Sequence, residues 1–144
     1  NFNEFMDNLN STDLEWFASF RVNITDKLEL DFYDELIGEG VKSLLPIRTL
    51  IAMMIMKQCL GWSDSQIMQE CKQDISVKHA LGIHLEDDLP SLLMLNKFRT
   101  MLENYKKTSG LDLFNITIEE LIAADGPVKK LGEGRIMLLA MRVA

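Results

Sequence analysis

The stretch PIRTLIAMMIM at Pro46–Met56 decides the fold of this 144-residue chain. Only Arg48 and Thr49 interrupt its run of apolar side chains. Pro46 suits the first turn of a helix, where a backbone N–H has no intrahelical partner, and Gly61 suits the position just after its end. A helix that is apolar on every side is buried. The sequence therefore predicts a central, buried helix that starts at Pro46 and stops before Gly61.

Two further helices are predicted before this central one. Ser11 or Thr12 can cap a helix that carries Trp16 and Phe20, because a hydroxyl accepts a hydrogen bond from the free N–H groups at a helix start. The segment Thr25–Ile37 has apolar residues at helical spacing, so it is predicted as a helix too.

Two short helices are predicted directly after the central one. Ser63, with Gln66 three residues later, forms a capping-box pattern that starts the first. Asp74 or Ser76 opens the second, and Gly82 ends it.

The last third of the chain completes the pattern. Ser91 caps a longer helix that Gly110 breaks, and Leu113–Ala124 is predicted as a further helix. A turn at 125–127 precedes the apolar tail Ile136–Val143, for which both strand and helix stay open. The predicted fold class is all-α, a compact multi-helix bundle around a central buried helix.

The composition is that of an ordinary globular domain, with 47% hydrophobic and 26% charged residues. A single helical domain over residues 1–144 is expected from this length. The sequence has no stretch organised as a signal peptide and no apolar run long enough to span a bilayer. We therefore expect a cytoplasmic protein without a membrane partner.

The net charge of −7 is unevenly distributed along the chain. Residues 1–41 hold 10 acidic and 2 basic side chains, whereas residues 42–107 hold 7 acidic and 9 basic ones. Residues 108–144 hold 5 acidic and 4 basic side chains. The middle segment is thus mildly basic, which permits a polyanionic partner there without requiring one.

Metal-binding and catalytic patterns are weak in this sequence. Structural zinc sites use closely spaced Cys or His pairs that converge. Only His79 and His84 have such spacing, and Gly82 interrupts the helix between them. Cys59 and Cys71 are predicted as buried, free thiols. No metal, cofactor or small-molecule substrate is expected, and an enzyme is not predicted.

Cationic and polar side chains after Gly61 favour a nucleic-acid surface. Two short helices followed by a longer third one resemble a tri-helical helix-turn-helix arrangement, in which the third helix lies near a DNA groove or phosphates. The candidate DNA contacts are Lys72, Lys78, Asn96, Lys97, Arg99, Thr100, Lys106 and Lys107.

Four motifs follow one another over about 60 residues. They are LPIRTLIA at Leu45–Ala52, GWSDSQI at Gly61–Ile67, HALGI at His79–Ile83, and a loop with Pro90 followed by a helix carrying Phe98-Arg99. In this order and spacing they resemble the N-terminal domain of DDE-type insertion-sequence transposases.

The resemblance implies a function as well as a fold. In such transposases this domain precedes an RNase-H-like catalytic domain and helps to recognise the element's terminal repeats or to assemble the transposition complex. The catalytic acidic triad lies downstream, and the tail 135–144 contains no Asp. We therefore expect a non-catalytic DNA-binding or positioning module with double-stranded DNA as partner, either truncated before the catalytic domain or a degenerate relic.

A second interpretation stays open at this point. The acidic N-terminal segment, the methionines of Met53–Met56 and the apolar tail also fit a helical dimerisation module that makes no contact with nucleic acid. Such a module would form a homodimer.

Overall fold

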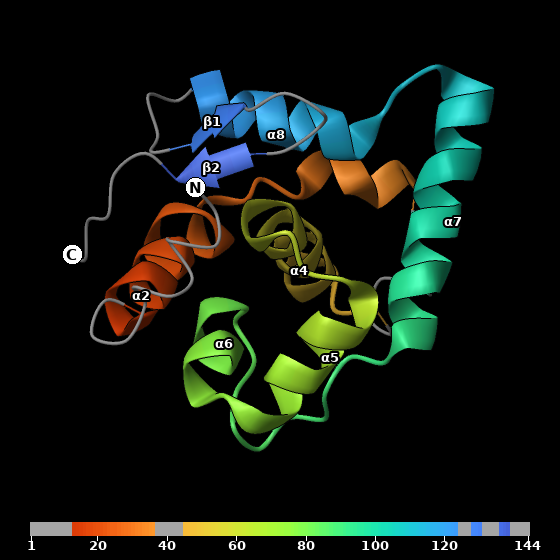
Figure 1. Cartoon of the computed structure of the whole chain (residues 1–144). Coiled ribbons are helices and arrows are strands. Elements are labelled where there is room, and N and C mark those ends of the chain that lie inside the picture. The colour runs from red at the N-terminus through yellow and green to blue at the C-terminus, as the bar shows by residue number, and fades with distance from the viewer. Residues whose placement is uncertain (1–12, 37–44, 124–127, 131–135, 139–144) are drawn as a thin grey trace.

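The computed structural model describes residues 13–36, 45–123, 128–130 and 136–138. One helix, α4 (Ile47–Leu60), runs through the middle of the molecule (Figure 1). Around it lie α2 (Asp13–Asn23), α5 (Asp64–Gln73), α6 (Ile75–Ala80), α7 (Leu92–Ser109) and α8 (Leu113–Ala123). The predicted all-helical bundle with a central helix is confirmed.

A small hairpin is added at the C-terminal side. The strands β1 (Val128–Lys130) and β2 (Ile136–Leu138) pair antiparallel, with Val128 opposite Leu138. The start of the apolar tail, left open by its sequence, is therefore extended at 136–138. Residues 139–144 lie outside the described part of the chain, as does the turn expected at 125–127.

The central helix owes its place to its apolar surface. Seven of its side chains have no solvent exposure at all, namely Leu50, Ile51, Ala52, Met53, Ile55, Met56 and Leu60. Met53 and Met56 are thus part of the core. Gly61 ends the helix with φ 68°, a left-handed conformation that other residues adopt only at a cost.

The prediction of one helix over Thr25–Ile37 is wrong. The chain instead forms two short 3-10 turns, η1 (Thr25–Lys27) and η2 (Asp31–Tyr33), with extended backbone at Leu28 between them. Only residues 34–36 of the predicted segment are α-helical. The guanidinium of Arg48 donates to the carbonyl oxygens of Thr25, at 2.7 Å, and of Leu28, at 3.2 Å. A tertiary contact therefore engages carbonyls that a continuous α-helix would use internally. Residue 37 lies outside the described residues.

Most of the predicted helix boundaries are confirmed. Ser63 and Gln66 form the full capping box, and Ser91 caps α7, which ends at Gly110. Asp74, rather than Ser76, opens α6: its carboxylate accepts a hydrogen bond from the Ser76 N–H at 2.8 Å. Asp74 also ends α5, so one residue joins the two helices in a tight turn. The caps predicted at 11–12 and the end at 124 are outside the described residues.

Candidate nucleic-acid interface and its supporting contacts

The longest helix, α7, has one buried side and one exposed side. Leu95, Phe98 and Leu102 face the core. The opposite side, here called the outer face of α7, consists of Leu93, Asn96, Lys97, Thr100, Glu103, Asn104 and Lys107, all exposed. Among the described residues, the side chains of Lys97, Thr100 and Lys107 have no hydrogen-bonding or ion-pair partner. This face therefore offers two free ammonium groups beside uncharged polar side chains and one carboxylate, that of Glu103.

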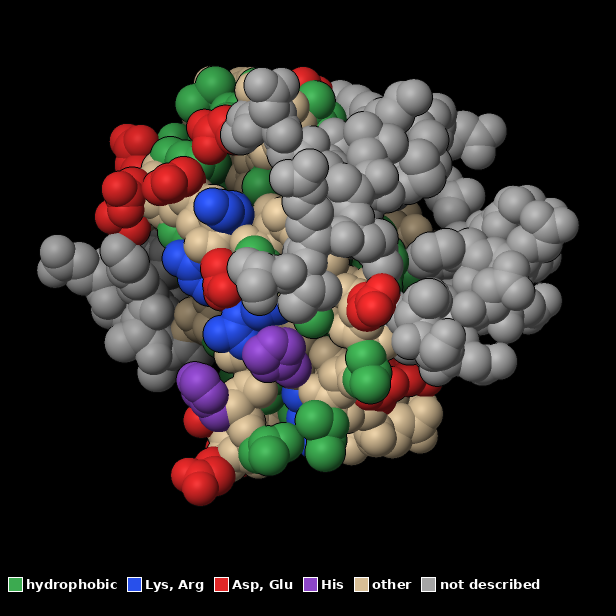
Figure 2. Space-filling view, turned by 90° about the vertical axis from the view of Figure 1, so that its left-hand side faces the viewer, with side chains coloured by type: hydrophobic (Ala, Val, Ile, Leu, Met, Phe, Trp, Pro, Cys, Tyr) green, Lys and Arg blue, Asp and Glu red, His purple; other side chains and the backbone are tan. Residues whose placement is uncertain are grey.

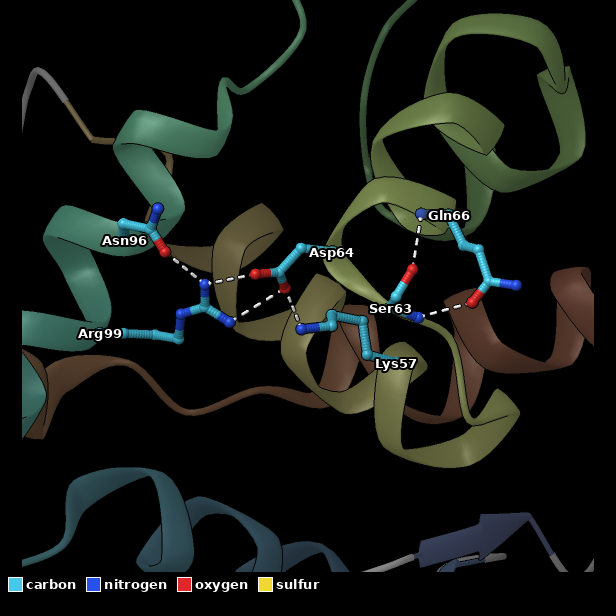
Figure 3. A network of polar contacts seen from close by, with 6 residues as sticks. All are labelled: Lys57, Ser63, Asp64, Gln66, Asn96 and Arg99. Atoms are coloured by element: carbon cyan, nitrogen blue, oxygen red, sulfur yellow. Dashed lines mark hydrogen bonds and ion pairs between the residues drawn. The ribbon is translucent and has the colours of Figure 1, made fainter.

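Arg99, a predicted DNA contact, is engaged inside the protein instead (Figure 3). Its two terminal nitrogens bind the two carboxylate oxygens of Asp64 at 3.0 and 2.8 Å. The side-chain oxygen of Asn96 accepts from the same guanidinium, and Lys57 contacts the same carboxylate. The four side chains come from α4, α5 and α7, so the group joins three helices (Figure 3).

Electrostatics favour the charged form of Asp64. The hydrogen bonds from Arg99 and then from Lys57 hold the pKa of its carboxyl far below the ordinary value. Asp64 is also the first residue of α5, where the helix dipole favours a negative charge. The ion pair is therefore complete throughout the neutral range of pH. Sequence reasoning missed Lys57 and Asp64, because no spacing in the chain indicates that Asp64 meets a residue 35 positions later.

The C-terminal end of α6 is held by three side chains. Three consecutive carbonyl oxygens lie at this end, where helical N–H partners run out. Those of His79, Ala80 and Leu81 accept hydrogen bonds from Arg21 at 2.8 Å, from Thr25 at 2.5 Å and from Thr49 at 3.0 Å, respectively. The His79 carbonyl also accepts from the Gly82 N–H at 3.1 Å. The HALGI motif is thus tied to α2, η1 and α4 through its backbone.

The arginines of the described residues are all used in this way. Arg21 and Arg48 bind backbone carbonyls, and Arg99 binds Asp64. Among the side chains that the structure describes, the exposed cations are lysines: Lys27, Lys72, Lys97, Lys106 and Lys107. Of these, Lys106 lies 3.7 Å from Asp112. A lysine is a point charge suited to phosphate, whereas guanine is read mainly by the planar fork of arginine.

The eight predicted DNA contacts do not form one surface. Six lie on α7, whereas Lys72 is in the last turn of α5 and Lys78 is on α6. α6 and α7 lie on opposite sides of α4 (Figure 1). On the α6 side, both histidines sit beside a short row of Lys and Arg side chains with Asp and Glu around it (Figure 2). The acidic neighbours weaken the positive potential there.

An acidic pocket lies beside α7 and restricts the part of this helix that DNA could approach. It has a volume of about 450 Å³ and lies between η2, α7 and α8. Its lining consists of Asp31, Phe32, Asp34, Glu35, Tyr105, Leu111, Leu113, Ile116 and Glu120. The hydroxyl of Tyr105 donates to a carboxylate oxygen of Glu35 at 3.1 Å. Four carboxylates would repel phosphate on this side of the helix.

The side chains that could ligate a metal ion do not come together. Within the described residues, no three His, Cys, Asp or Glu side chains are grouped so that they could hold a metal ion. Both cysteines are free; Cys71 is buried and Cys59 is partly buried. Burial raises the pKa of the Cys71 thiol to about 11.

No helix of the described part combines the length and apolar composition needed to cross a bilayer.

These features define a helical domain in which sequence motifs serve as contacts between helices. Residues 17–101, from α2 into α7, match the family described as "Transposase domain (DUF772)". The match covers more than half of the chain, which therefore belongs to this family of transposase domains. The resemblance to a transposase domain, identified from the four motifs, is thereby confirmed. No curated protein and no solved structure matches the chain.

Proposed function

We propose that this domain is a non-catalytic DNA-positioning module of a transposase-related protein, in which the outer face of α7 binds the phosphates of duplex DNA. The observation that carries the proposal is the pair of free, exposed lysines, Lys97 and Lys107, on one side of one helix. They are ten residues apart, or about 15 Å along the helix axis, which allows contacts with separate phosphates. Asn104 and Thr100 between them can donate hydrogen bonds to the same backbone.

The contacts favour positioning over sequence reading. Because the described arginines bind other parts of the protein, base readout would depend on Lys, Asn and Thr side chains without an arginine fork. Few phosphates are neutralised by two lysines, so binding is expected to be weak and sensitive to salt. We also expect little discrimination between terminal-repeat and unrelated duplexes.

No catalytic step is assigned to these helices. Their best-placed carboxylate, Asp64, is held by two cations, and Tyr33 is fixed by hydrogen bonds to Thr117 and Leu113. These groups serve helix packing. In the family that the chain belongs to, catalysis is expected from carboxylates outside this domain.

A salt titration of DNA binding tests the proposal. Fluorescence anisotropy with a labelled linear duplex should show binding at low salt that weakens steadily as salt rises. Reversing both charges, Lys97→Glu with Lys107→Glu, should weaken binding by about tenfold or more. Arg99 is left unchanged, since its replacement would also break the contact with Asp64.

The matched control is Lys27→Glu on η1, which reverses another exposed lysine away from α7. It should weaken binding clearly less than Lys97→Glu or Lys107→Glu, each measured as a single variant. Absence of binding by the unmodified chain at low salt, or an equal loss in the control, would overturn the proposal.

A helical dimerisation module is the second candidate. Leu85 and Leu93 are large apolar side chains with 70% and 77% exposure, which favours a protein contact. The burial of Met53 and Met56, by contrast, removes the methionines as support for this function. Light scattering over a concentration series decides it, because a monomer mass at every concentration would exclude a dimer.

A further inference from the structure

We infer that Asp64 and Arg99 form a positioning pair: they fix how the outer face of α7 is presented to DNA, and Arg99 itself makes no DNA contact. The inference rests on the proposed DNA-positioning function. It assigns a role to two residues that come from the second and fourth motifs of the sequence, GWSDSQI and Phe98-Arg99.

The geometry makes this pair sensitive to the rotation of α7. Both carboxylate oxygens of Asp64 are bound by separate nitrogens of one planar guanidinium. Such a fork tolerates little change in direction, so turning α7 about its axis would break both hydrogen bonds. These two hydrogen bonds join α7 directly to the start of α5.

The partner of this fork is itself held in place. The Ser63 hydroxyl accepts from the Gln66 N–H at 3.1 Å, and the Gln66 side chain accepts from the Ser63 N–H at 2.7 Å. This capping box fixes the first turn of α5, where Asp64 is the next residue. Lys57, in the last turn of α4, binds the same carboxylate (Figure 3). The position of α7 is thereby fixed relative to the turn between α4 and α5.

The side chain of Arg99 leaves α7 on the flank between its two sides. Its neighbour Phe98 is fully buried, and its neighbour Thr100 belongs to the outer face. Arg99 therefore links the fixed side of the helix to the side proposed for DNA. Asn96, one turn earlier on the outer face, is bound to the same guanidinium.

A charge argument separates a positioning role from a DNA contact. Replacing Asp64 by Asn removes one negative charge and releases a guanidinium. If Arg99 were a phosphate ligand, this change would strengthen DNA binding. If the pair positions α7, the same change weakens binding although the protein has become less negative. The two roles predict opposite signs.

The experiment measures duplex affinity and its salt dependence for five variants. We expect Asp64→Asn, Arg99→Gln and Arg99→Lys each to weaken binding about three- to tenfold. Arg99→Lys keeps the charge but loses the fork, so it distinguishes geometry from charge. The double variant Asp64→Asn/Arg99→Gln should bind no worse than either single variant, as coupled residues do. The control Glu15→Gln removes an exposed acid from α2, away from α7, and should bind as tightly as the unmodified chain.

Two results would overturn the inference. One is tighter binding by Asp64→Asn. The other is a salt slope that falls by about one in Arg99→Gln, which is expected when a phosphate contact is lost. Binding is compared at a temperature where thermal unfolding shows every variant to be folded. If Asp64→Asn or Arg99→Gln is not folded, the conclusion is drawn from Arg99→Lys, which keeps the charge of the side chain.

A measurement without DNA keeps this inference separate from the proposed function. Hydrogen exchange over residues 92–109 should be faster in Asp64→Asn than in the unmodified chain, and unchanged in Glu15→Gln. Equal exchange in Asp64→Asn and the unmodified chain would overturn the positioning role. If the unmodified chain binds no DNA, the proposed function fails, while the exchange result still decides whether the pair holds α7.

Discussion

The two longest helices, α4 and α7, are built alike but do different work. α4 has 14 residues and α7 has 18, and each ends at a glycine in the left-handed conformation, Gly61 with φ 68° and Gly110 with φ 79°. α4 is enclosed on nearly all sides. α7 buries one side and leaves the other to solvent.

The difference shows what a family motif reports in this protein. LPIRTLIA forms the start of the enclosed helix, and its polar members Arg48 and Thr49 bind carbonyls of other segments. Phe98 and Arg99 likewise point to the core and to Asp64. The motifs therefore identify a scaffold. The lysines proposed to touch DNA, Lys97 and Lys107, stand outside the motif residues.

The largest expected effect comes from the buried side of α7. Phe98 is fully buried, and its ring centroid lies 6.1 Å from that of Tyr33. Phe98→Ala removes a large side chain and leaves a cavity, so we expect the free energy of unfolding to fall by about 3 to 5 kcal/mol. Urea unfolding followed by circular dichroism measures this loss.

The control is the adjacent residue on the other side of the same helix. Lys97→Ala should change the free energy of unfolding by no more than about 0.5 kcal/mol, because its exposed side chain has no partner among the described residues. A loss comparable with that of Phe98→Ala would break the distinction between the two sides of α7.

A smaller effect is expected beneath α7, at Tyr33. Its hydroxyl lies 2.6 Å from the Thr117 hydroxyl and donates to the Leu113 carbonyl at 3.2 Å, both in α8. Tyr33→Phe removes these contacts and should cost about 1 kcal/mol at neutral pH. Burial raises the pKa of Tyr33 to about 12, so the folded chain holds this proton more tightly than the unfolded chain.

The sign of the pH dependence follows from that difference. The stabilising contribution is complete below the ordinary tyrosine pKa of about 10 and is lost as the pH rises towards 12. Urea unfolding at pH 8 and pH 11 should therefore show a smaller alkaline loss in Tyr33→Phe than in the unmodified chain. An identical loss in both would contradict the assignment of this proton.

Much of the fold could be predicted from local chemistry. The capping box at Ser63, the cap at Ser91 and the apolar run of α4 act within a few residues, so their sequence patterns are sufficient. The 3-10 turns at η1 and η2 could not be predicted. They depend on the guanidinium of Arg48, which reaches back 23 residues to the Thr25 carbonyl.

The candidate site was predicted only in part, because some of its contacts are local and others join distant parts of the chain. Exposure of Lys97 and Lys107 follows from the helical period of α7, which the sequence displays. The engagement of Arg99 does not, because a basic residue at the border of an amphipathic helix is equally suited to solvent, to phosphate or to an acid on another helix. Only the three-dimensional placement of Asp64 decides among these.

The smallest expected effect concerns the pair of Asp64 and Arg99, which joins α7 to the α4–α5 part. Asp64→Asn should lower the free energy of unfolding at pH 7 by about 1 kcal/mol or less, since the pair is partly exposed to solvent. Arg99 and Lys57 lower the pKa of Asp64, so the folded chain releases this proton more readily than the unfolded chain. The contribution is therefore present above the ordinary carboxyl pKa of about 4 and is lost at lower pH. Thermal unfolding from pH 7 to pH 3 should show the stability difference between the unmodified chain and Asp64→Asn narrowing in acid. A difference that stays constant over this range would mean that α7 is held to α4 and α5 by apolar packing alone.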